Sequence, residues 1–261
     1  MRFILLVFVI ISGSQQSKLK SRNSLRPFIH GGQTISIDQA PYQASLQKYG
    51  THHCGGSIIS EKWILTACHC VENFKSSDKL KVRVGTSYRN TGGKTIDVKN
   101  VFSHPNCFAH HHNSDNKLYD AALIELQDNI VFDKNKRAVK LPSLNENLNI
   151  GSTVKVTGWG ETKSSLYSYQ LMSVEVKVFD HQKCEKVYSH NDIKVGPDVI
   201  CAGIRGGGKD SCGGDSGGPL VHKETLFGIV SWGKGCGSAK YPGVYTNVAY
   251  IRDWIKKQSG V

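Results

Sequence analysis

The sequence has only one long apolar run, and it lies at the very start of the chain. The run extends from Phe3 to Ile11, follows Arg2 and precedes small residues, which is the order typical of a secretory signal peptide. It is too short to anchor a protein in a bilayer, although a buried N-terminal strand would also be apolar. We expect residues 1–14 to be a signal peptide, and the protein to be secreted into the extracellular space without a membrane partner.

Acidic residues are missing from the first 28 positions. Residues 15–28 are polar and basic, as in a flexible activation pro-segment. Of the 33 Lys and Arg residues in the chain, 28 lie beyond this segment with all 21 Asp and Glu residues, a formal net charge of +7. The basic residues are scattered and are not interleaved with aromatics as in nucleic-acid-binding modules. We therefore expect a solvated basic surface and no nucleic-acid partner.

Helical periodicity is also scarce. Only residues 248–258 place apolar side chains on one helical face, with Ile251, Trp254 and Ile255 at the spacing i, i+3, i+4. Elsewhere, from Ile29 onward, short β-type runs are separated by Gly, Asn, Asp and Ser. Many strands and one late helix predict an all-β barrel or sandwich protein. The runs are QASLQ, GGSIIS, WILTA, LKVRVG, AALIEL, STVKVTGWG, MSVEVKVF, LFGIVSWG and GVYTNV.

Three segments carry residue types that together support nucleophilic catalysis. Ser216 stands in KDSCGGDSGGPL, where glycines allow a tight turn whose N–H groups can converge on an oxyanion. His69 in WILTACHC can be the base that a serine hydroxyl needs, and Asp120 in LYDAALIEL can orient the imidazole. Each has an ordinary alternative, namely a glycine-rich loop, a core histidine and a strand cap. Together, in the order His, Asp, Ser, they indicate a catalytic triad.

With these motifs the chain resembles a trypsin-like serine protease of the chymotrypsin family, from Ile29 to Val261. The resemblance implies an all-β fold of two six-stranded antiparallel barrels, with the active site between them and a C-terminal helix. It implies one protease domain over residues 29–261, a monomer and no cofactor. The stretch GGKDSCGGDSGGP is similar to mite trypsins known as group 3 allergens. The other matching motifs are IHGG, HCGGSII, DAALIEL, TGWG, DVICAG, IVSWGKGC and YPGVYTNV.

The resemblance also implies a role for each site residue. Ser216 is the nucleophile, His69 the general base and then acid, and Asp120 the orienting residue, while the N–H groups of Gly214 and Ser216 bind the oxyanion. The resemblance also implies a substrate-binding pocket. Asp210 is its floor, Ser211 is a hydroxyl beside that floor, and Gly233 and Gly243 are its small walls. Ser231 and Trp232 belong to the strand that pairs with the substrate backbone, and Tyr188 and Tyr245 match trypsin-type residues near the pocket.

These roles predict an endopeptidase that cleaves protein or peptide substrates after Lys or Arg through an acyl-enzyme. Protein protease inhibitors are further expected partners. The alternative is a protease-fold binding protein, a pseudoprotease with little or no catalytic activity.

Eight cysteines in an exported chain predict disulfides. Parity alone does not decide the pairing. The resemblance implies the pairs Cys54–Cys70, Cys184–Cys201 and Cys212–Cys236. Cys68 and Cys107 lie outside the family's usual set, and we expect them to form a fourth bridge.

Metal-binding patterns are weak. His110, His111 and His112 are consecutive, and consecutive loop residues do not converge easily on one ion. They lie in segment 106–120, which is several residues longer than in a typical trypsin. Residues 84–97 correspond to the family's calcium loop but lack paired acids. We expect no bound metal.

The junction between Phe28 and Ile29 acquires a role through Asp215. A buried carboxylate without a cation is costly, and the resemblance pairs Asp215 with the α-amino group that cleavage at this junction would create at Ile29. Phe28, preceded by Pro27, is not a site for a trypsin-like enzyme, so we expect a different activating protease. His30 stands where the family usually has a small β-branched residue.

Overall fold

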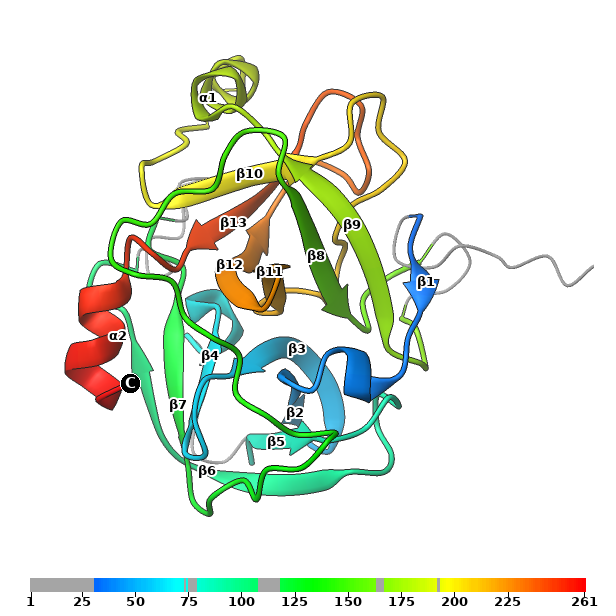
Figure 1. The fold of residues 1–261 in the computed structure, drawn as a ribbon, viewed down its shortest axis with the longest axis vertical. Helices are drawn as coiled ribbons and strands as arrows, with labels where there is room; N and C mark the ends of the chain where they lie inside the picture. The colour runs from blue at the N-terminus through cyan, green and yellow to red at the C-terminus, as the bar shows by residue number, and fades with distance from the viewer. Residues whose placement is uncertain (1–30, 73, 75–78, 108–117, 163–166, 192) are drawn as a thin grey trace, which may run out of the picture.

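The structure is a computed structural model, and it describes residues 31–72, 74, 79–107, 118–162, 167–191 and 193–261. These residues form two barrels that lie one above the other in Figure 1, with a helix beside each. No helix among them is long and apolar enough to cross a membrane. The predicted signal peptide and pro-segment lie outside the described residues.

The first barrel contains six antiparallel strands in the closed order β2-β3-β4-β7-β6-β5. Closure comes from the pairing of β2 with β5, in which Ala44 lies opposite Val84. Two short 3-10 helices accompany this barrel: η1 (Ile37–Gln39) and η2 (Cys68–Cys70). The strands are β2 (Gln43–Lys48), β3 (Thr51–Ile58), β4 (Trp63–Thr66), β5 (Lys81–Val84), β6 (Lys94–Ser103) and β7 (Ala122–Leu126).

The second barrel is closed by the pairing of β8 with β9, so that β8, β9, β10, β13, β12 and β11 form a ring. The short strand β1 (Gln33–Thr34) adds to the edge of β9. The two closed antiparallel barrels confirm the predicted fold class. The strands are β8 (Thr153–Gly158), β9 (Met172–Val178), β10 (Val199–Gly203), β11 (Pro219–His222), β12 (Thr225–Trp232) and β13 (Gly243–Asn247).

Side-chain alternation explains why these segments form barrel strands. In β9, Val174, Val176 and Val178 are buried, whereas Glu175 and Lys177 between them are exposed. Successive side chains of a strand point to opposite faces, so the valines fill the barrel and the charged residues face water. The strands β6, β10 and β11 were not among the predicted runs; in β6 the pattern is mostly polar, and only Ile96 is buried.

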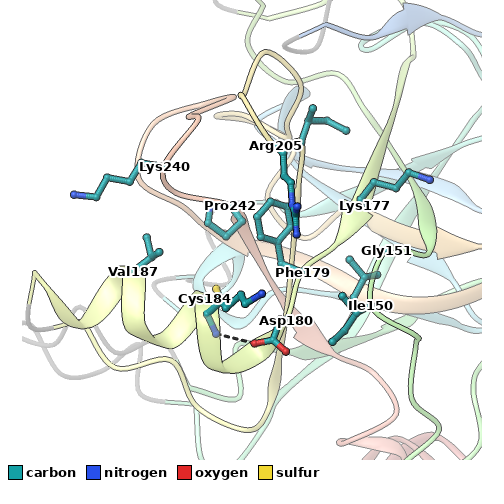
Figure 2. A pocket seen from close by; sticks show the side chains of 13 residues that line it. Ile150, Gly151, Lys177, Phe179, Asp180, Cys184, Val187, Arg205, Lys240 and Pro242 are labelled. Atoms are coloured by element: carbon teal, nitrogen blue, oxygen red, sulfur yellow. Dashed lines mark hydrogen bonds between the residues drawn. The ribbon is translucent and has the colours of Figure 1, made fainter.

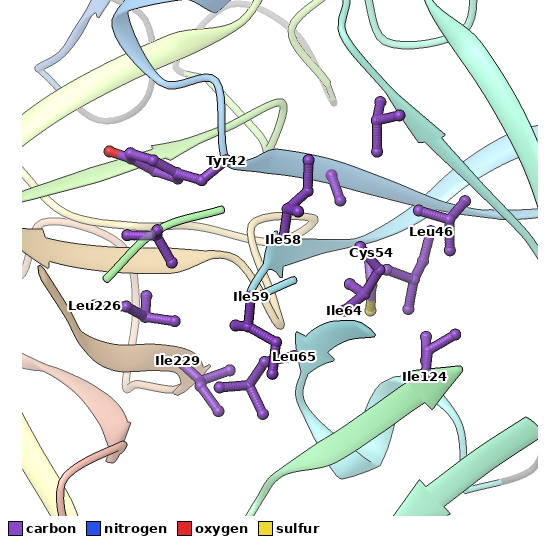
Figure 3. Packing of buried hydrophobic residues seen from close by; sticks show 14 of the residues in the cluster. Tyr42, Leu46, Cys54, Ile58, Ile59, Ile64, Leu65, Ile124, Leu226 and Ile229 are labelled. Atoms are coloured by element: carbon purple, nitrogen blue, oxygen red, sulfur yellow. The ribbon is translucent and has the colours of Figure 1, made fainter. Parts of the chain in front are cut away.

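The hydrophobic core joins the two barrels. Figure 3 shows Ile58, Ile59 and Leu65 of the first barrel packed together with Leu226 and Ile229 of β12. Burial of a large aliphatic side chain stabilises a fold by about 1.5–3 kcal/mol. The shared cluster therefore holds the barrels against each other, and the active-site residues occupy the ends of strands at this junction.

Two α-helices complete the fold. The predicted C-terminal helix is confirmed as α2 (Arg252–Ser259), with Ile255 fully buried. The expectation of a single helix is wrong, because α1 (His181–Ser189) follows β9. This helix is mostly polar, and its two buried side chains are Cys184 and Tyr188, four residues apart on one face. Its visible signal is Asp180, whose carboxylate accepts a hydrogen bond from the N–H of Lys183 and caps the helix.

Candidate active site

Strand pairing places His69 next to Asp120. Strand β4 ends at Thr66, which pairs with Ala122 at the start of β7. The chain continues from β4 into η2, which contains His69, and Asp120 lies just before β7. Two residues that are 51 positions apart in the sequence therefore meet at the same end of the first barrel.

Asp120 holds His69 through two hydrogen bonds. One carboxylate oxygen accepts the backbone N–H of His69 at 2.9 Å, and the other lies 2.7 Å from His69 Nδ1. Ser231 donates its hydroxyl to that second oxygen. A carboxylate only accepts, so Nδ1 carries a proton and donates it to Asp120, and whenever the ring holds a single proton the lone pair is on Nε2.

Asp120 stays ionised although it is only 2% exposed. Burial by itself raises the pKa of this carboxyl, but the charge of nearby His69 and the hydrogen bonds from His69 and Ser231 outweigh it. The pKa lies below its usual value as a result. The pair therefore provides an imidazole with a fixed orientation and a stabilising negative charge behind it.

Ser216 lies on a turn that only glycines can form. Gly214 and Gly217 have φ values of +87° and +77°, in the left-handed region that side chains disfavour. A Cβ at Gly217 would lie 2.2 Å from Thr66 Oγ1 of the first barrel. The glycines therefore let the turn approach the end of β4, where η2 begins.

The turn leaves two N–H groups available. Within it, the N–H of Asp215 donates to Cys212 O and the N–H of Gly218 donates to Asp215 O. Among the described residues, no hydrogen bond uses the N–H of Gly214 or Ser216. These are the two donors that the sequence assigned to the oxyanion.

His52 supports this turn, although no motif in the sequence predicts that role. Burial lowers the pKa of His52 to about 4, so its ring is neutral. Because the carbonyl oxygen of Gly214 can only accept, Nε2 of His52 carries the proton and donates at 3.0 Å, and Nδ1 accepts the Ser45 hydroxyl at 2.8 Å. Nothing in the local sequence THHCGG distinguishes such a histidine from an ordinary strand residue.

One cavity of about 280 Å³ brings the predicted residues together. His69 and Ser216 line it together with the whole predicted substrate-binding set. Further glycines and the Cys212–Cys236 disulfide also form part of its walls. That set consists of Asp210, Ser211, Ser231, Trp232, Gly233 and Gly243.

Asp210 is the charged group of the cavity. It is 3% exposed, and its two oxygens accept the N–H groups of Ser211 and Gly237 at 2.9 and 3.2 Å. No Lys or Arg of the described ranges forms an ion pair with it. Burial raises its pKa to about 7. A buried carboxylate with a raised pKa binds a cation favourably. The nearby positive charge stabilises the ionised carboxylate, which burial has deprived of water.

The cavity walls are small where they meet Asp210. A Cβ on Gly243 would lie 2.6 Å from Asp210 Oδ1, so any other residue would collide with the carboxylate. Tyr245 OH lies 3.1 Å from Ser211 Oγ, and Tyr188 donates its hydroxyl to Pro242 O at 2.6 Å. The two tyrosines brace the strand that carries Gly243.

Glu161 is a second acidic group near the reactive turn, and it was not predicted. Its N–H donates to Gly213 O, and its carboxylate fills the space that a side chain at Gly213 would need, 2.7 Å from the position of a Cβ. The signal in the sequence is the glycine at 213, which makes room for it.

Four disulfides are present, in the four pairs expected from the sequence. Both chain neighbours of His69 are bridged, Cys68 to Cys107 and Cys70 to Cys54. The other two, Cys184–Cys201 and Cys212–Cys236, lie in the second barrel. The segment that carries His69 is thus tied covalently on both sides.

Asp215 is fully buried behind the reactive turn. Its oxygens accept the N–H groups of Gly160 at 2.8 Å and Cys212 at 3.0 Å, and burial raises its pKa to about 6. In the part of the chain that the structure describes, no cation pairs with it. Its expected partner Ile29 lies outside the described residues, as do His30 and the histidines 110–112.

Two cysteines lie beside His69 among the described residues. In the described ranges, one group of side chains could gather around an ion: Cys54, Cys70 and His69. The two sulfurs form a disulfide, so they are not thiolates and cannot ligate a metal in the usual way.

Comparison with known proteins agrees with the geometry. Residues 29–255 match the Trypsin family model. The chain is 42% identical to Trypsin 5G1 of Aedes aegypti over 89% of this chain and 85% of that protein. It is 38% identical to Trypsin epsilon of Drosophila erecta, covering 88% and 86%, and 37% identical to the Vitellin-degrading protease of Bombyx mori, covering 97% and 92%.

These three relatives are insect proteins, and similarity to mite trypsins stays a prediction. The matches cover nearly all of the chain beyond the first 28 residues at identities well above chance, and they include the segments that form the cavity. The chain therefore belongs to the trypsin family and is a serine endopeptidase.

Proposed function

We propose that this protein is a secreted endopeptidase that cleaves polypeptides after Lys or Arg and is made as an inactive precursor. The observation that carries the specificity is Asp210, a buried carboxylate with a raised pKa in the cavity lined by His69 and Ser216. A long cationic side chain entering this cavity gains a charge-assisted hydrogen bond in a site largely shielded from water.

In the proposed reaction, Ser216 Oγ attacks the carbonyl carbon before the scissile bond. Its proton passes to Nε2 of His69, which keeps a lone pair because Nδ1–H is directed at Asp120. The N–H groups of Gly214 and Ser216 stabilise the oxyanion, a contribution of about 10²–10³ in rate per donor. The C–N bond then breaks as His69 protonates the leaving amine, which leaves the acyl group as an ester on Ser216. Water attacks this ester and gives its proton to His69, and the ester bond breaks as His69 returns a proton to Ser216 Oγ.

Labelling of the serine is the first test. An organophosphorus serine probe should label the processed protein at Ser216 with a stoichiometry of one, and the His69→Ala variant should react far more slowly. Absence of labelling in correctly processed protein would favour the pseudoprotease alternative.

Specificity is tested separately with short reporter substrates. Substrates ending in Arg or Lys should be cleaved with a much higher kcat/KM than those ending in Phe or Leu. Preference for Phe or Leu would contradict the role proposed for Asp210 without affecting the family assignment.

The activation step rests on Asp215. A carboxylate buried without a cation is unfavourable, and the α-amino group of Ile29 would supply that cation after cleavage at Phe28. Protein beginning at Ile29 should be active, whereas protein retaining Phe28 should be nearly inactive. Equal activity of the two forms would refute the switch. The Asp215→Asn variant beginning at Ile29 is the control and should resemble the uncut form.

A further inference from the structure

The second barrel carries another cavity that the endopeptidase reaction does not use. Its volume is about 520 Å³, within the usual range of ligand sites. It is bordered by the end of β9, one face of α1, the loop after β10 and the segment before β13 (Figure 2). It shares no lining residue with the cavity of His69 and Ser216.

The walls of this cavity are apolar. Figure 2 shows the ring of Phe179 and the ring of Pro242 in its centre, with Ile150 to one side. Ile150 is 66% exposed, so its side chain offers apolar surface at the edge of the cavity. The remaining apolar lining comes from Val178, Val187 and Ile204. A bulky apolar side chain could replace water here with a favourable free energy.

The rim of the cavity is basic. Lys177, Lys183, Arg205 and Lys240 line it and are all exposed. In the described ranges none of them forms an ion pair: Lys177 donates to the hydroxyl of Thr153, and Lys240 lies over the ring of Tyr241.

A single acidic residue lines the cavity. Asp180 is already engaged, because its carboxylate caps α1 by accepting the N–H of Lys183 at 2.9 Å. The rim therefore has an excess of positive charge that the protein itself does not neutralise. An occupant of this cavity must be apolar at its centre and anionic at its edges.

We propose that this cavity is a docking site for an acidic segment of a protein, in which a bulky apolar side chain is flanked by carboxylates. The chain's own residues 15–28 do not suit it, because they contain four basic residues, Lys18, Lys20, Arg22 and Arg26, and no acid. A second copy of the chain is also disfavoured by its net positive charge. A separate protein with an acidic, apolar stretch has the complementary chemistry.

The position of the cavity suits recruitment of substrates. Pro242 lines the docking cavity, and the next residue, Gly243, lines the catalytic cavity. The two cavities are therefore neighbours, and for a substrate long enough to reach both openings, attachment at the first site would raise its effective concentration at the second. This recruiting role rests on the proposed endopeptidase function, whereas binding to the cavity does not.

Binding is tested with protein that cannot cleave. The Ser216→Ala chain is titrated into a short fluorescein-labelled peptide of alternating Phe and Glu, and fluorescence anisotropy is measured at low and at physiological salt. The peptide contains no Lys or Arg. We expect saturable binding that weakens with salt, and at least fivefold weaker binding of the matched peptide with Gln in place of Glu.

Charge-reversal variants localise the binding. Lys183→Glu with Arg205→Glu should weaken it by about tenfold, and Ile150→Ser should weaken it by a smaller factor. Lys94→Glu with Lys134→Glu changes the net charge equally, on an exposed residue of β6 and an exposed residue of the segment after β7, and should have little effect. Equal loss from both double variants would overturn the proposal in favour of diffuse attraction, as would binding of anionic phosphatidylserine vesicles, or of dodecyl sulfate, without binding of the peptide.

Activity then separates docking from catalysis. With active protein, the Lys183→Glu, Arg205→Glu variant should cleave a short Arg reporter as well as the parent does. It should lose its preference for the same reporter extended by the Phe-Glu segment. If the parent itself shows no preference for the extended reporter although the peptide binds, the site binds acidic segments but the recruiting role is wrong.

Discussion

Each barrel contributes one half of the candidate active site, and the two halves differ in the partners of their buried carboxylates. In the first barrel, His69 and Asp120 are held by paired strands, by hydrogen bonds from three donors to one carboxylate and by two disulfides beside His69. In the second barrel, Asp210 and Asp215 are buried with raised pKa values and accept hydrogen bonds only from uncharged groups of the described residues.

This difference indicates that the two barrels have different roles. The first half needs no further partner, because the carboxylate of Asp120 already accepts hydrogen bonds from His69 and Ser231. The second half has two carboxylates that need cations from elsewhere. Under the proposed function, the substrate supplies one and the new N-terminus supplies the other. Binding and activation would then act on the second barrel, while the general base stays in place.

The largest effect is expected from a substitution of Asp120, the carboxylate of the first barrel. Asp120→Asn would place an amide N–H₂ opposite His69 and favour the tautomer with its proton on Nε2, which cannot act as a base. We expect kcat to fall by about 10⁴-fold, a size established for Ser-His-Asp triads in general rather than worked out from this chain. Steady-state kinetics with an Arg reporter measure it. A loss below tenfold would show that the geometry of His69 does not depend on the carboxylate.

The second barrel's role in binding a substrate cation is tested by Asp210→Asn. The substitution keeps the shape of the side chain but leaves a substrate cation without a charged partner, which costs about 2–5 kcal/mol. We expect kcat/KM for an Arg reporter to fall by about 10³-fold. The value for a Phe reporter should stay the same or rise, and a parallel loss for both would indicate a damaged fold.

Removal of the Cys68–Cys107 bridge tests the covalent support of the first half. The bridge closes a loop with a sequence separation of 39, so Cys68→Ala with Cys107→Ala should lower the free energy of unfolding by about 4 kcal/mol. Thermal melting measures this as a decrease of about 10 °C.

The matched control for that bridge is Cys184→Ala with Cys201→Ala, which opens a loop with a separation of 17 in the second barrel, away from His69. It should lower stability slightly less, by about 3 kcal/mol. At a temperature where both variants are folded, kcat should fall more in the Cys68 variant. Equal kcat values would show that the bridge stabilises the barrel without positioning His69.

The smallest effect is the pH dependence of cation binding. In the empty cavity the pKa of Asp210 is about 7, and a bound cation lowers it by stabilising the carboxylate. Affinity is therefore full above pH 7 and is lost as the pH falls below it. The dissociation constant of an arylamidine should rise about tenfold from pH 8 to pH 6. The dissociation constant is measured by fluorescence titration of the His69→Ala variant, in which the ionisable group at position 69 is absent. A dissociation constant that does not change with pH would contradict the raised pKa of Asp210.

Much of this arrangement is predictable from sequence. The strands with clear two-residue alternation, such as β9, and the final helix with Ile251, Trp254 and Ile255 follow from local patterns. The motifs around His69, Asp120 and Ser216 indicate a triad through residue type and chain order alone. By contrast, α1 buries two side chains, Cys184 and Tyr188, and β6 buries one, Ile96, so the local hydrophobic signal of both elements is weak.

Residue types in recognisable motifs are enough to predict the proposed chemistry, with Ser216 as nucleophile, His69 as base and Asp210 as the carboxylate that selects a cation. The contacts that hold and surround these residues are visible in the folded protein but not in the motifs. The contact of His52 with Gly214, the place of Glu161 over Gly213 and the basic rim around Phe179 bring together residues far apart in the chain. Such contacts arise when strands close into barrels and pack, and no local pattern specifies them.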